Sequence, residues 1–230
     1  LLIGTERANN AELGFKSTLW DHRLQLNANV FWTQVNAYQT NAYDAENRVQ
    51  YLTNAGSVRS RGVEFESTVI PLRGLTLNIN GSYNDVSYLS YKDAPCPPEV
   101  SQAPGAPASC DLSGHQVVGA SKWIGNANGE YKWNLDNGFE PYVTASYAFR
   151  SKAVGTVEDS DYGQIPSYAV VNFSTGLRGD FNQGQWDVSL WLKNAFDKTY
   201  YTTLWTGGNG GYEGLLGTPR TLGVTGRYDF

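Results

Sequence analysis

The sequence of 230 residues has no methionine, only two cysteines and no long apolar run. A membrane-spanning helix needs about 18 consecutive apolar residues, and no stretch comes near that length. The mean hydropathy is -0.42, a value typical of soluble proteins. Strands that alternate apolar and polar residues also average to a polar value, so a membrane β-barrel is compatible with the same figure.

Two further absences narrow the classes of protein. The formal net charge is -5 and no Lys/Arg cluster occurs, which argues against nucleic acid as a partner. The chain begins Leu1-Leu2-Ile3, with neither methionine nor a signal peptide. We therefore expect it to be part of a longer gene product.

The two cysteines, Cys96 and Cys110, enclose a proline-rich stretch without helical periodicity. No histidine lies beside them to complete a zinc site. We expect a local disulfide, formed in an oxidising compartment, that stabilises the loop by about 3 kcal/mol at most. Two free thiols in an unconstrained loop are the alternative.

Alternation of apolar and polar residues is the dominant pattern, and it predicts nine strands. In the last one, Leu222, Val224 and Tyr228 share a face, and Thr221 and Thr225 lie on the other. The nine segments are Glu12–Leu19, Leu24–Trp32, Val63–Val69, Leu75–Asn84, Trp123–Trp133, Phe139–Arg150, Val171–Phe181, Trp186–Lys193 and Thr221–Phe230.

The connections between these segments alternate in length. Short turns are predicted at Asp21-His22, Pro71–Gly74, Leu135–Gly138 and Asn182–Gln185, and long polar loops at Thr40–Gln50, Lys92–Ser121, Ala153–Ser167 and Ala195–Thr218. Asn137-Gly138 predicts a hairpin, because both positions tolerate positive φ. Outer-membrane barrels have this asymmetry, with short periplasmic turns and long extracellular loops.

Aromatic residues bracket the apolar faces. Those at the loop ends are Trp32, Tyr83 and Phe149, and those at the turn ends are Phe139, Trp186, Tyr228 and Phe230. About nine residues separate the two levels, which suits a tilted strand crossing hydrocarbon between two interfacial girdles. Arg59 and Arg61 are an even number of residues from Val63, so regular alternation would point them toward lipid. We expect either that they lie above the bilayer or that a bulge near Gly62 reverses the alternation.

A soluble β-sandwich or propeller would also show many alternating strands. Its solvated face would be rich in Lys and Glu, whereas only 17% of this chain is charged and the polar faces are dominated by Asn, Ser, Thr and Gly. Strands longer than ten residues are also unusual in sandwiches. We predict an all-β, transmembrane, antiparallel up-and-down barrel.

Four segments resemble TonB-dependent outer-membrane receptors. Trp191–Tyr201 resembles their N-L-F-D-K-x-Y segment, with Ala195 in place of the common Leu. Gly217–Val224 resembles the G-x-P-R start of their last strand, Gly62–Glu66 their G-V-E-x-E strand, and Ala11–Lys16 their E-x-G-x-K strand.

This resemblance implies a barrel of 22 strands around a globular plug. Residues 1–230 would then be its C-terminal portion, about the last nine strands, without the plug and earlier strands. It also implies that Tyr228 and the terminal Phe230 belong to the signal read by the barrel-assembly machinery, while a girdle anchor is the simpler role for Phe230. The final strand would run from an extracellular loop to a periplasmic C-terminus.

The resemblance further implies TonB-dependent uptake of a ferric siderophore or similar iron complex, without enzymatic chemistry or a cofactor. Its partners would be outer-membrane lipid and lipopolysaccharide, the rest of the receptor barrel, the ligand, and the TonB complex acting through the plug. The alternatives are another cargo (cobalamin, haem or a saccharide), a passive porin or adhesin-type barrel, and a soluble carbohydrate-binding or hydrolytic β-domain.

No catalytic constellation is recognisable, and His22 and His115 are too far apart in the sequence to suggest a metal site. Ligand contacts are expected in the loops. The aromatic candidates there are Tyr38, Tyr43, Tyr162, Trp205 and Tyr212, and a lumen-facing Arg150 could attract an anionic complex. Loop packing by the aromatics and ion pairing by Arg150 are the alternatives.

Overall fold

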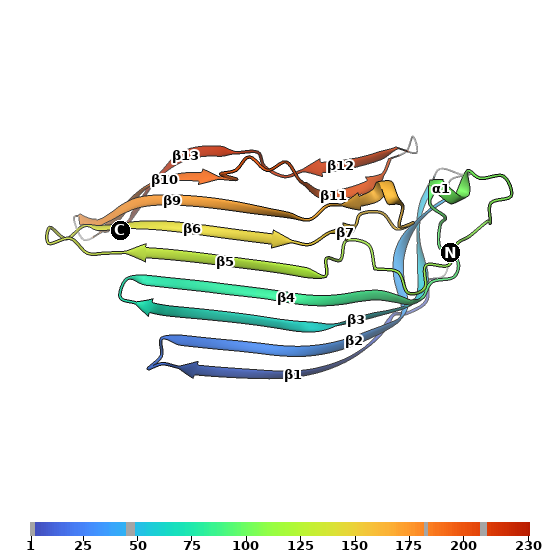
Figure 1. Ribbon diagram of the computed structural model, residues 1–230, viewed down its shortest axis with the longest axis horizontal. Helices are drawn as coiled ribbons and strands as arrows, with labels where there is room; N and C mark the ends of the chain where they lie inside the picture. Colours follow the sequence, from blue (N-terminus) through green and yellow to red (C-terminus); the bar gives the residue numbers. More distant parts are fainter. Residues whose placement is uncertain (1–2, 45–48, 182–183, 208–210) are drawn as a thin grey trace.

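The computed structural model describes residues 3–44, 49–181, 184–207 and 211–230, with side chains omitted for 41–44, 49–50 and 55. These residues form one antiparallel nine-stranded sheet in the order β1-β2-β3-β4-β5-β6-β9-β10-β13 (Figure 1). The predicted all-β fold and nine strands are thereby confirmed. Within the described part of the chain, no helix is long and apolar enough to cross a membrane.

The strands of this sheet follow chain order, so each pairs with the preceding and following one. Their bounds are β1 Arg7–Leu19, β2 Leu24–Asp44, β3 Val49–Leu72, β4 Leu75–Ser90, β5 Trp123–Lys132, β6 Glu140–Arg150, β9 Tyr168–Phe181, β10 Gly184–Lys193 and β13 Thr221–Asp229. The sheet is open, with β1 and β13 at its two edges, and corresponds to part of a barrel.

The register keeps apolar side chains on one face across all nine strands. Val63 lies opposite Val30 on β2 and Tyr83 on β4, and Phe173 lies opposite Ala145 on β6 and Leu192 on β10. Because side chains alternate along a strand, the residues between them share the other face. We call these the apolar face and the polar face.

Short turns join the strands at one end of the sheet, the turn end. Residues 20–23 connect β1 to β2, and Gly74, with φ of 87°, ends the β3–β4 turn. The predicted hairpin at Asn137-Gly138 joins β5 to β6, and of these two residues only Gly138 has positive φ, at 82°. The Asn137 carboxamide instead accepts a hydrogen bond from the Phe139 N–H at 3.2 Å. The predicted turn at Asn182–Gln185 lies partly outside the described residues.

Three long connections lie at the opposite end, the loop end, and each contains short elements of its own. The first, between β4 and β5, contains α1 (Pro98–Ser101). The second, between β6 and β9, contains β7 (Ala153–Val154), the 3₁₀ turn η1 (Asp161–Gly163) and β8 (Gln164–Ile165). The third, between β10 and β13, contains the hairpin of β11 (Tyr201–Thr206) and β12 (Tyr212–Leu216) (Figure 1).

The predicted long loop at Thr40–Gln50 was wrong. The β2–β3 hairpin continues as paired strand as far as Asp44 and Val49, leaving only four residues between them. Its polar residues look loop-like in sequence, but Thr, Tyr and Gln also suit a solvated strand. In Figure 1 this extension bends over toward the connection that carries α1.

The alternatives for Arg59 and Arg61 are resolved by the β3–β4 ladder. Its pairing is unbroken from Val58 opposite Tyr88 to Val69 opposite Leu77, so no bulge occurs near Gly62. Both arginines therefore stay on the apolar face, and they lie beyond the row in which Val63 pairs with Tyr83.

Candidate functional site

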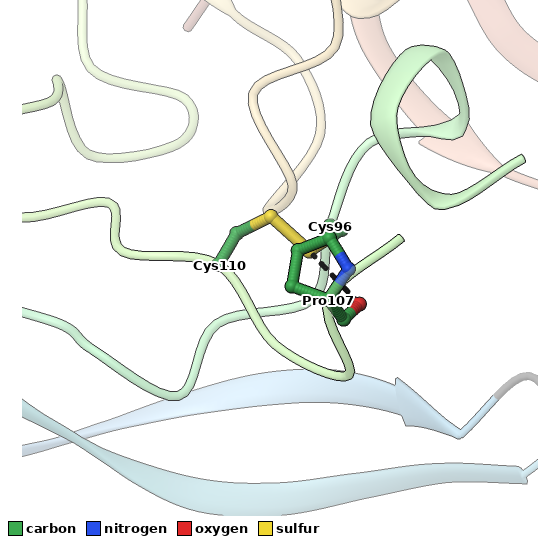
Figure 2. The surroundings of a disulfide bond; sticks show 3 residues. All are labelled: Cys96, Pro107 and Cys110. Carbon is green, nitrogen blue, oxygen red and sulfur yellow. Dashed lines mark hydrogen bonds between the residues drawn. A yellow bond between two sulfur atoms is a disulfide. The ribbon is translucent and has the colours of Figure 1, made fainter. Parts of the chain in front are cut away.

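A cap of three long connections covers the loop end of the sheet. A disulfide joins Cys96 to Cys110 at the base of the first connection, with Cα atoms 5.0 Å apart (Figure 2). Reciprocal backbone hydrogen bonds between Ala94 and Cys110, at 2.9 and 3.0 Å, hold the same crossing point. The α1 segment is therefore carried on a closed loop with a fixed base.

A small apolar core anchors this loop to the sheet. It consists of Val58, Tyr88, Tyr91, Ala94, Leu112 and Val117. The Tyr88 ring lies 5.0 Å from that of Tyr91 and 6.4 Å from that of Tyr38, centroid to centroid. Burial, with a smaller contribution from neighbouring Tyr51, raises the pKa of Tyr91 to about 12, so its hydroxyl stays neutral at physiological pH.

The first and second connections are joined by polar contacts. A Glu99 carboxylate oxygen accepts hydrogen bonds from the Ser160 hydroxyl at 2.7 Å and the Asp161 N–H at 2.8 Å. Desolvation opposes ionisation of Glu99, but these hydrogen bonds outweigh it and lower its pKa. His115 Nδ1 lies 2.8 Å from an Asp159 carboxylate oxygen and forms a second link.

The third connection joins the same assembly. The Thr206 hydroxyl donates to a Glu158 carboxylate oxygen at 2.7 Å. Gly155 lies so close to Leu204 that an added Cβ would be 2.8 Å from the Leu204 Cβ. The three connections consequently form one interlocked cap, although they are far apart in the sequence.

The aromatic ligand-contact candidates occupy different positions in this cap. Tyr162 is 72% exposed, and the Trp205 indole N–H donates to Glu213 at 3.2 Å. Tyr38 and Tyr212 are half-buried, Tyr38 against the loop core. The side chain of Tyr43 lies outside the described residues. Tyr162 and Trp205 are thus the two candidates that the structure leaves most accessible.

Arg150 ties the first connection to the sheet. Its guanidinium donates to the Ser121 hydroxyl at 2.6 Å and to the Gly119 carbonyl. Arg150 lies on the polar face, as the alternation in its strand predicts. In the sheet it pairs with Ile124 on β5 and Tyr168 on β9. These contacts give Arg150 a positioning role for the segment that leads into β5.

An ionic network on the polar face was not anticipated as a unit. Arg178 on β9 donates to Glu130 at 3.2 Å, Glu140 at 3.3 Å and Asp187 at 3.0 Å. Its guanidinium also lies 4.0 Å above the Tyr142 ring. Only the register of β5, β6, β9 and β10 brings these residues together.

A second polar cluster lies on β1 to β3. The Asn29 carboxamide donates to Glu12 at 2.8 Å and to Glu64 at 3.4 Å. A shallow hollow beside it is also lined by Lys16 and Glu66. The polar face therefore presents carboxylates and amides in ordered arrays.

The apolar face is exposed, and its larger part is uncharged. From the row of Val30, Val63, Tyr83 and Trp123 down to the turns, the described strands carry no charged side chain on this face. Apolar side chains there are strongly exposed, among them Leu13 at 74%, Val188 at 48% and Val224 at 69%. A continuous exposed apolar surface of this kind marks contact with lipid or another apolar partner.

Aromatic pairs lie at both limits of this surface. Tyr83 and Trp123 have ring centroids 4.7 Å apart toward the loop end, and Phe139 and Trp186 have centroids 5.7 Å apart toward the turn end. Tyr228 at the turn end donates to the Phe181 carbonyl at 2.9 Å, and Phe230 is fully exposed.

No group of three or more His, Cys, Asp or Glu among the described residues is arranged to hold a metal ion. His22 lies in the β1–β2 turn and His115 in the first long connection, so the structure does not bring them together.

Comparison with known proteins identifies the fold. The family model "TonB dependent receptor-like, beta-barrel" matches residues 3–195. The chain belongs to this family. Solved structures with the same fold include the ferric yersiniabactin uptake receptor FyuA from Yersinia pestis, with 18% identity and a TM-score of 0.72, covering 98% of this chain and 30% of FyuA. The siderophore receptor PiuA from Acinetobacter baumannii has 18% identity and a TM-score of 0.69, covering 96% of this chain and 28% of PiuA.

A third similar structure is FpvA from P. aeruginosa, solved with bound pyoverdine and iron, with 17% identity and a TM-score of 0.64. It is covered over 28% of its length, and this chain over 99%. The chain thus spans about 30% of the length of these TonB-dependent receptors, and the resemblance seen in its motifs is confirmed.

Proposed function

We propose that this chain is the C-terminal portion of a TonB-dependent outer-membrane transporter that takes up a ferric siderophore or a similar iron complex. The observation that carries the proposal is the family match over residues 3–195. The similar structures support the iron cargo, since they are described as a ferric yersiniabactin uptake receptor, a siderophore receptor and the ferric preacinetobactin receptor.

The proposed membrane placement rests on the apolar face. An exposed surface without charges, limited by aromatic pairs at both ends, suits hydrocarbon between two interfaces. Its apolar side chains then contact lipid, the loop end is extracellular and the turn end is periplasmic. Tyr228 and Phe230 lie at the periplasmic end, where we propose that they serve as the barrel-assembly signal as well as interfacial anchors.

The polar face then lines the lumen. The networks around Arg178 and Asn29 keep its charges paired or hydrogen-bonded. The free edges of β1 and β13 would pair with the remaining strands of the barrel, because an exposed edge offers unpaired N–H and C=O groups. The plug within that barrel would contact the TonB complex, which couples transport to the proton-motive force.

Ligand capture is assigned to the cap. Tyr162 and Trp205 offer accessible aromatic surface to planar or apolar parts of a ligand. Tyr38, Tyr43 and Tyr212 remain candidates for second contacts, and Arg150 contributes positive charge near the base of the cap. Binding and release by loop and plug movement need no covalent chemistry, no enzymatic step and no cofactor.

Uptake measurements test this proposal directly. A deletion strain is offered a panel of ferric siderophores labelled with radioactive iron, with a complemented strain and a strain lacking TonB as controls. We expect uptake of at least one complex to be lost in the deletion and TonB-deficient strains and restored by complementation. Unchanged uptake of every complex would contradict iron transport. Loss of cobalamin, haem or saccharide uptake instead would assign that cargo, and uptake independent of TonB would favour a passive porin.

A further inference from the structure

A cluster of cations lies on the apolar face at its loop-end limit. Arg61 pairs across the β3–β4 ladder with Asp85, one row beyond Val63 and Tyr83, and Arg59 lies one row further. Lys122, just before β5, approaches the same carboxylate. Arg61 and Lys122 have side chains that are 54% and 49% exposed. Three cations therefore accompany one carboxylate on a surface that is otherwise apolar.

The contacts within this cluster leave two cations weakly engaged. Arg61 binds Asp85 with two nitrogens, Nε and Nη2, each 3.1 Å from Oδ2. Arg59 and Lys122 lie 4.0 Å from the Asp85 oxygens, beyond hydrogen-bond distance. The excess positive charge is available to an anion that approaches along the sheet surface, and guanidinium groups suit phosphate because their N–H donors match its oxygens.

An apolar groove lies directly below the cluster. It is lined by Val63, Phe65, Tyr83, Trp123, Gly125 and Phe149, together with Gly81. Gly81 and Gly125 pair with each other in the row between Phe65 and Phe149, and the Phe65 ring covers Gly81, where an added Cβ would lie 2.8 Å from it. A Cβ at Gly125 would have only one neighbour within 4 Å, the Asn80 carbonyl oxygen at 3.9 Å, so the groove is open there.

The arrangement of cations above an apolar groove matches an amphiphile with an anionic head and a hydrocarbon tail. We propose that Arg59, Arg61 and Lys122 bind the phosphate of a membrane lipid whose acyl chain lies in the groove over Gly125. This inference rests on the proposed membrane insertion, and it adds a lipid site that is separate from the cap assigned to ligand capture. Tyr83 and Trp123 would lie at the junction between headgroup and chain, where aromatic rings are favoured.

Lipid retention by the full-length protein tests the site. The protein is purified in detergent, titrated with diphosphorylated lipid A and examined by native mass spectrometry. R61Q/K122Q removes the two most exposed cations and leaves Arg59 near Asp85. R23Q/R73Q is the matched control, because it removes two cations from turns at the opposite end of the sheet. Lipid A stripped of phosphate, and competition by inorganic phosphate, separate the lipid from free phosphate as the ligand.

We expect R61Q/K122Q to weaken binding roughly ten- to thirtyfold, since each cation beside an anionic lipid surface contributes appreciably to attraction. R23Q/R73Q should bind as the unmodified protein does. D85N should strengthen binding by removing the competing carboxylate, and G125L should weaken it by filling the groove while the cations remain. These two variants keep the proposal testable if R61Q/K122Q fails to fold.

Equal binding by R61Q/K122Q and R23Q/R73Q, or equal retention of phosphate-free lipid A, would overturn the proposal. Complete competition by inorganic phosphate would also overturn it in favour of a free-phosphate site. Uptake of the iron complex by the same variants separates this inference from the proposed function. Normal uptake with lost lipid binding would leave the transport function intact, whereas lipid binding by an unmodified protein that takes up no iron complex would count against transport alone.

Discussion

Replacing Ile79 by arginine would place a cation near the middle of the apolar face. Ile79 is four residues from Leu75 at the turn end of β4 and four from Tyr83 at the aromatic level. Four residues at about 3.3 Å, on a strand tilted by about 45°, correspond to a depth of roughly 9 Å from either limit. Ile79 would therefore lie near the centre of the hydrocarbon.

An arginine on the lipid face near the bilayer midplane costs about 2–4 kcal/mol. The matched control is Asn80→Arg, one residue along the same strand but on the polar face, where Asn80 pairs with Glu66. This control loses the 3.2 Å hydrogen bond from Asn126 but gains a carboxylate opposite the new cation. We expect its cost to be about 1 kcal/mol or less.

Guanidinium unfolding of the full-length protein in phospholipid vesicles measures both free energies. The account predicts that Ile79→Arg is more destabilising than Asn80→Arg by at least about 1–3 kcal/mol. In a soluble protein, Ile79, which is 39% exposed, would tolerate arginine with an effect of about 0.5 kcal/mol or less. Equal effects of the two substitutions would refute lipid contact by this face.

Three further predictions concern packing, the polar network and pH. Gly62→Ala should lower the free energy of unfolding by about 2 kcal/mol or more in the same assay, because its Cβ would collide with the Tyr83 carbonyl oxygen on β4, whereas Gly125→Ala should be nearly neutral. Arg178→Leu should lower the free energy of unfolding by about 1–3 kcal/mol, because it leaves three carboxylates without their shared cation. Arg227→Leu is its control and should lower it by at most about 1 kcal/mol, because the ion pair of Arg227 is exposed. The pKa of Glu99 lies below its ordinary 4.5 in the folded protein, so its contribution is present above that value and is lost as the pH falls through the lowered pKa. The protection factors of amides in the cap, which correct for the intrinsic exchange rate, should therefore fall at acidic pH in the unmodified protein, and Glu99→Gln should remove that pH-dependent component. Identical pH profiles of the protection factors would contradict the assignment.

The strands and their faces were predictable because a period of two is visible in each segment by itself. Leu222, Val224 and Tyr228 share a face in any register, and the same is true of Leu75, Leu77 and Ile79. The number of strands and the up-and-down order follow from the turns between them. The hairpin at Asn137-Gly138 was predictable for the same reason, although Asn137 accepts a hydrogen bond with its side chain and does not adopt positive φ.

The cap and the polar networks were not predictable, because they depend on residues distant in the sequence. Glu99 reaches Ser160, and Arg178 reaches Glu130, only after the strands are arranged side by side. The β2–β3 extension was missed for a different reason. Its residues are mostly polar, and the buried Thr40 and half-buried Tyr38 do not give the apolar alternation by which the other strands were recognised.

Labelling along β10 tests the central claim most directly. Single cysteines are introduced at successive positions from Asp187 to Leu192 in the full-length protein, where Cys96 and Cys110 are already joined, and each is given a fluorescent label. In lipid vesicles the account predicts alternation, with labels at Val188, Leu190 and Leu192 quenched by a lipid-phase quencher and those between them quenched by an aqueous one. The same accessibility to the aqueous quencher at every position would contradict a membrane-inserted barrel wall.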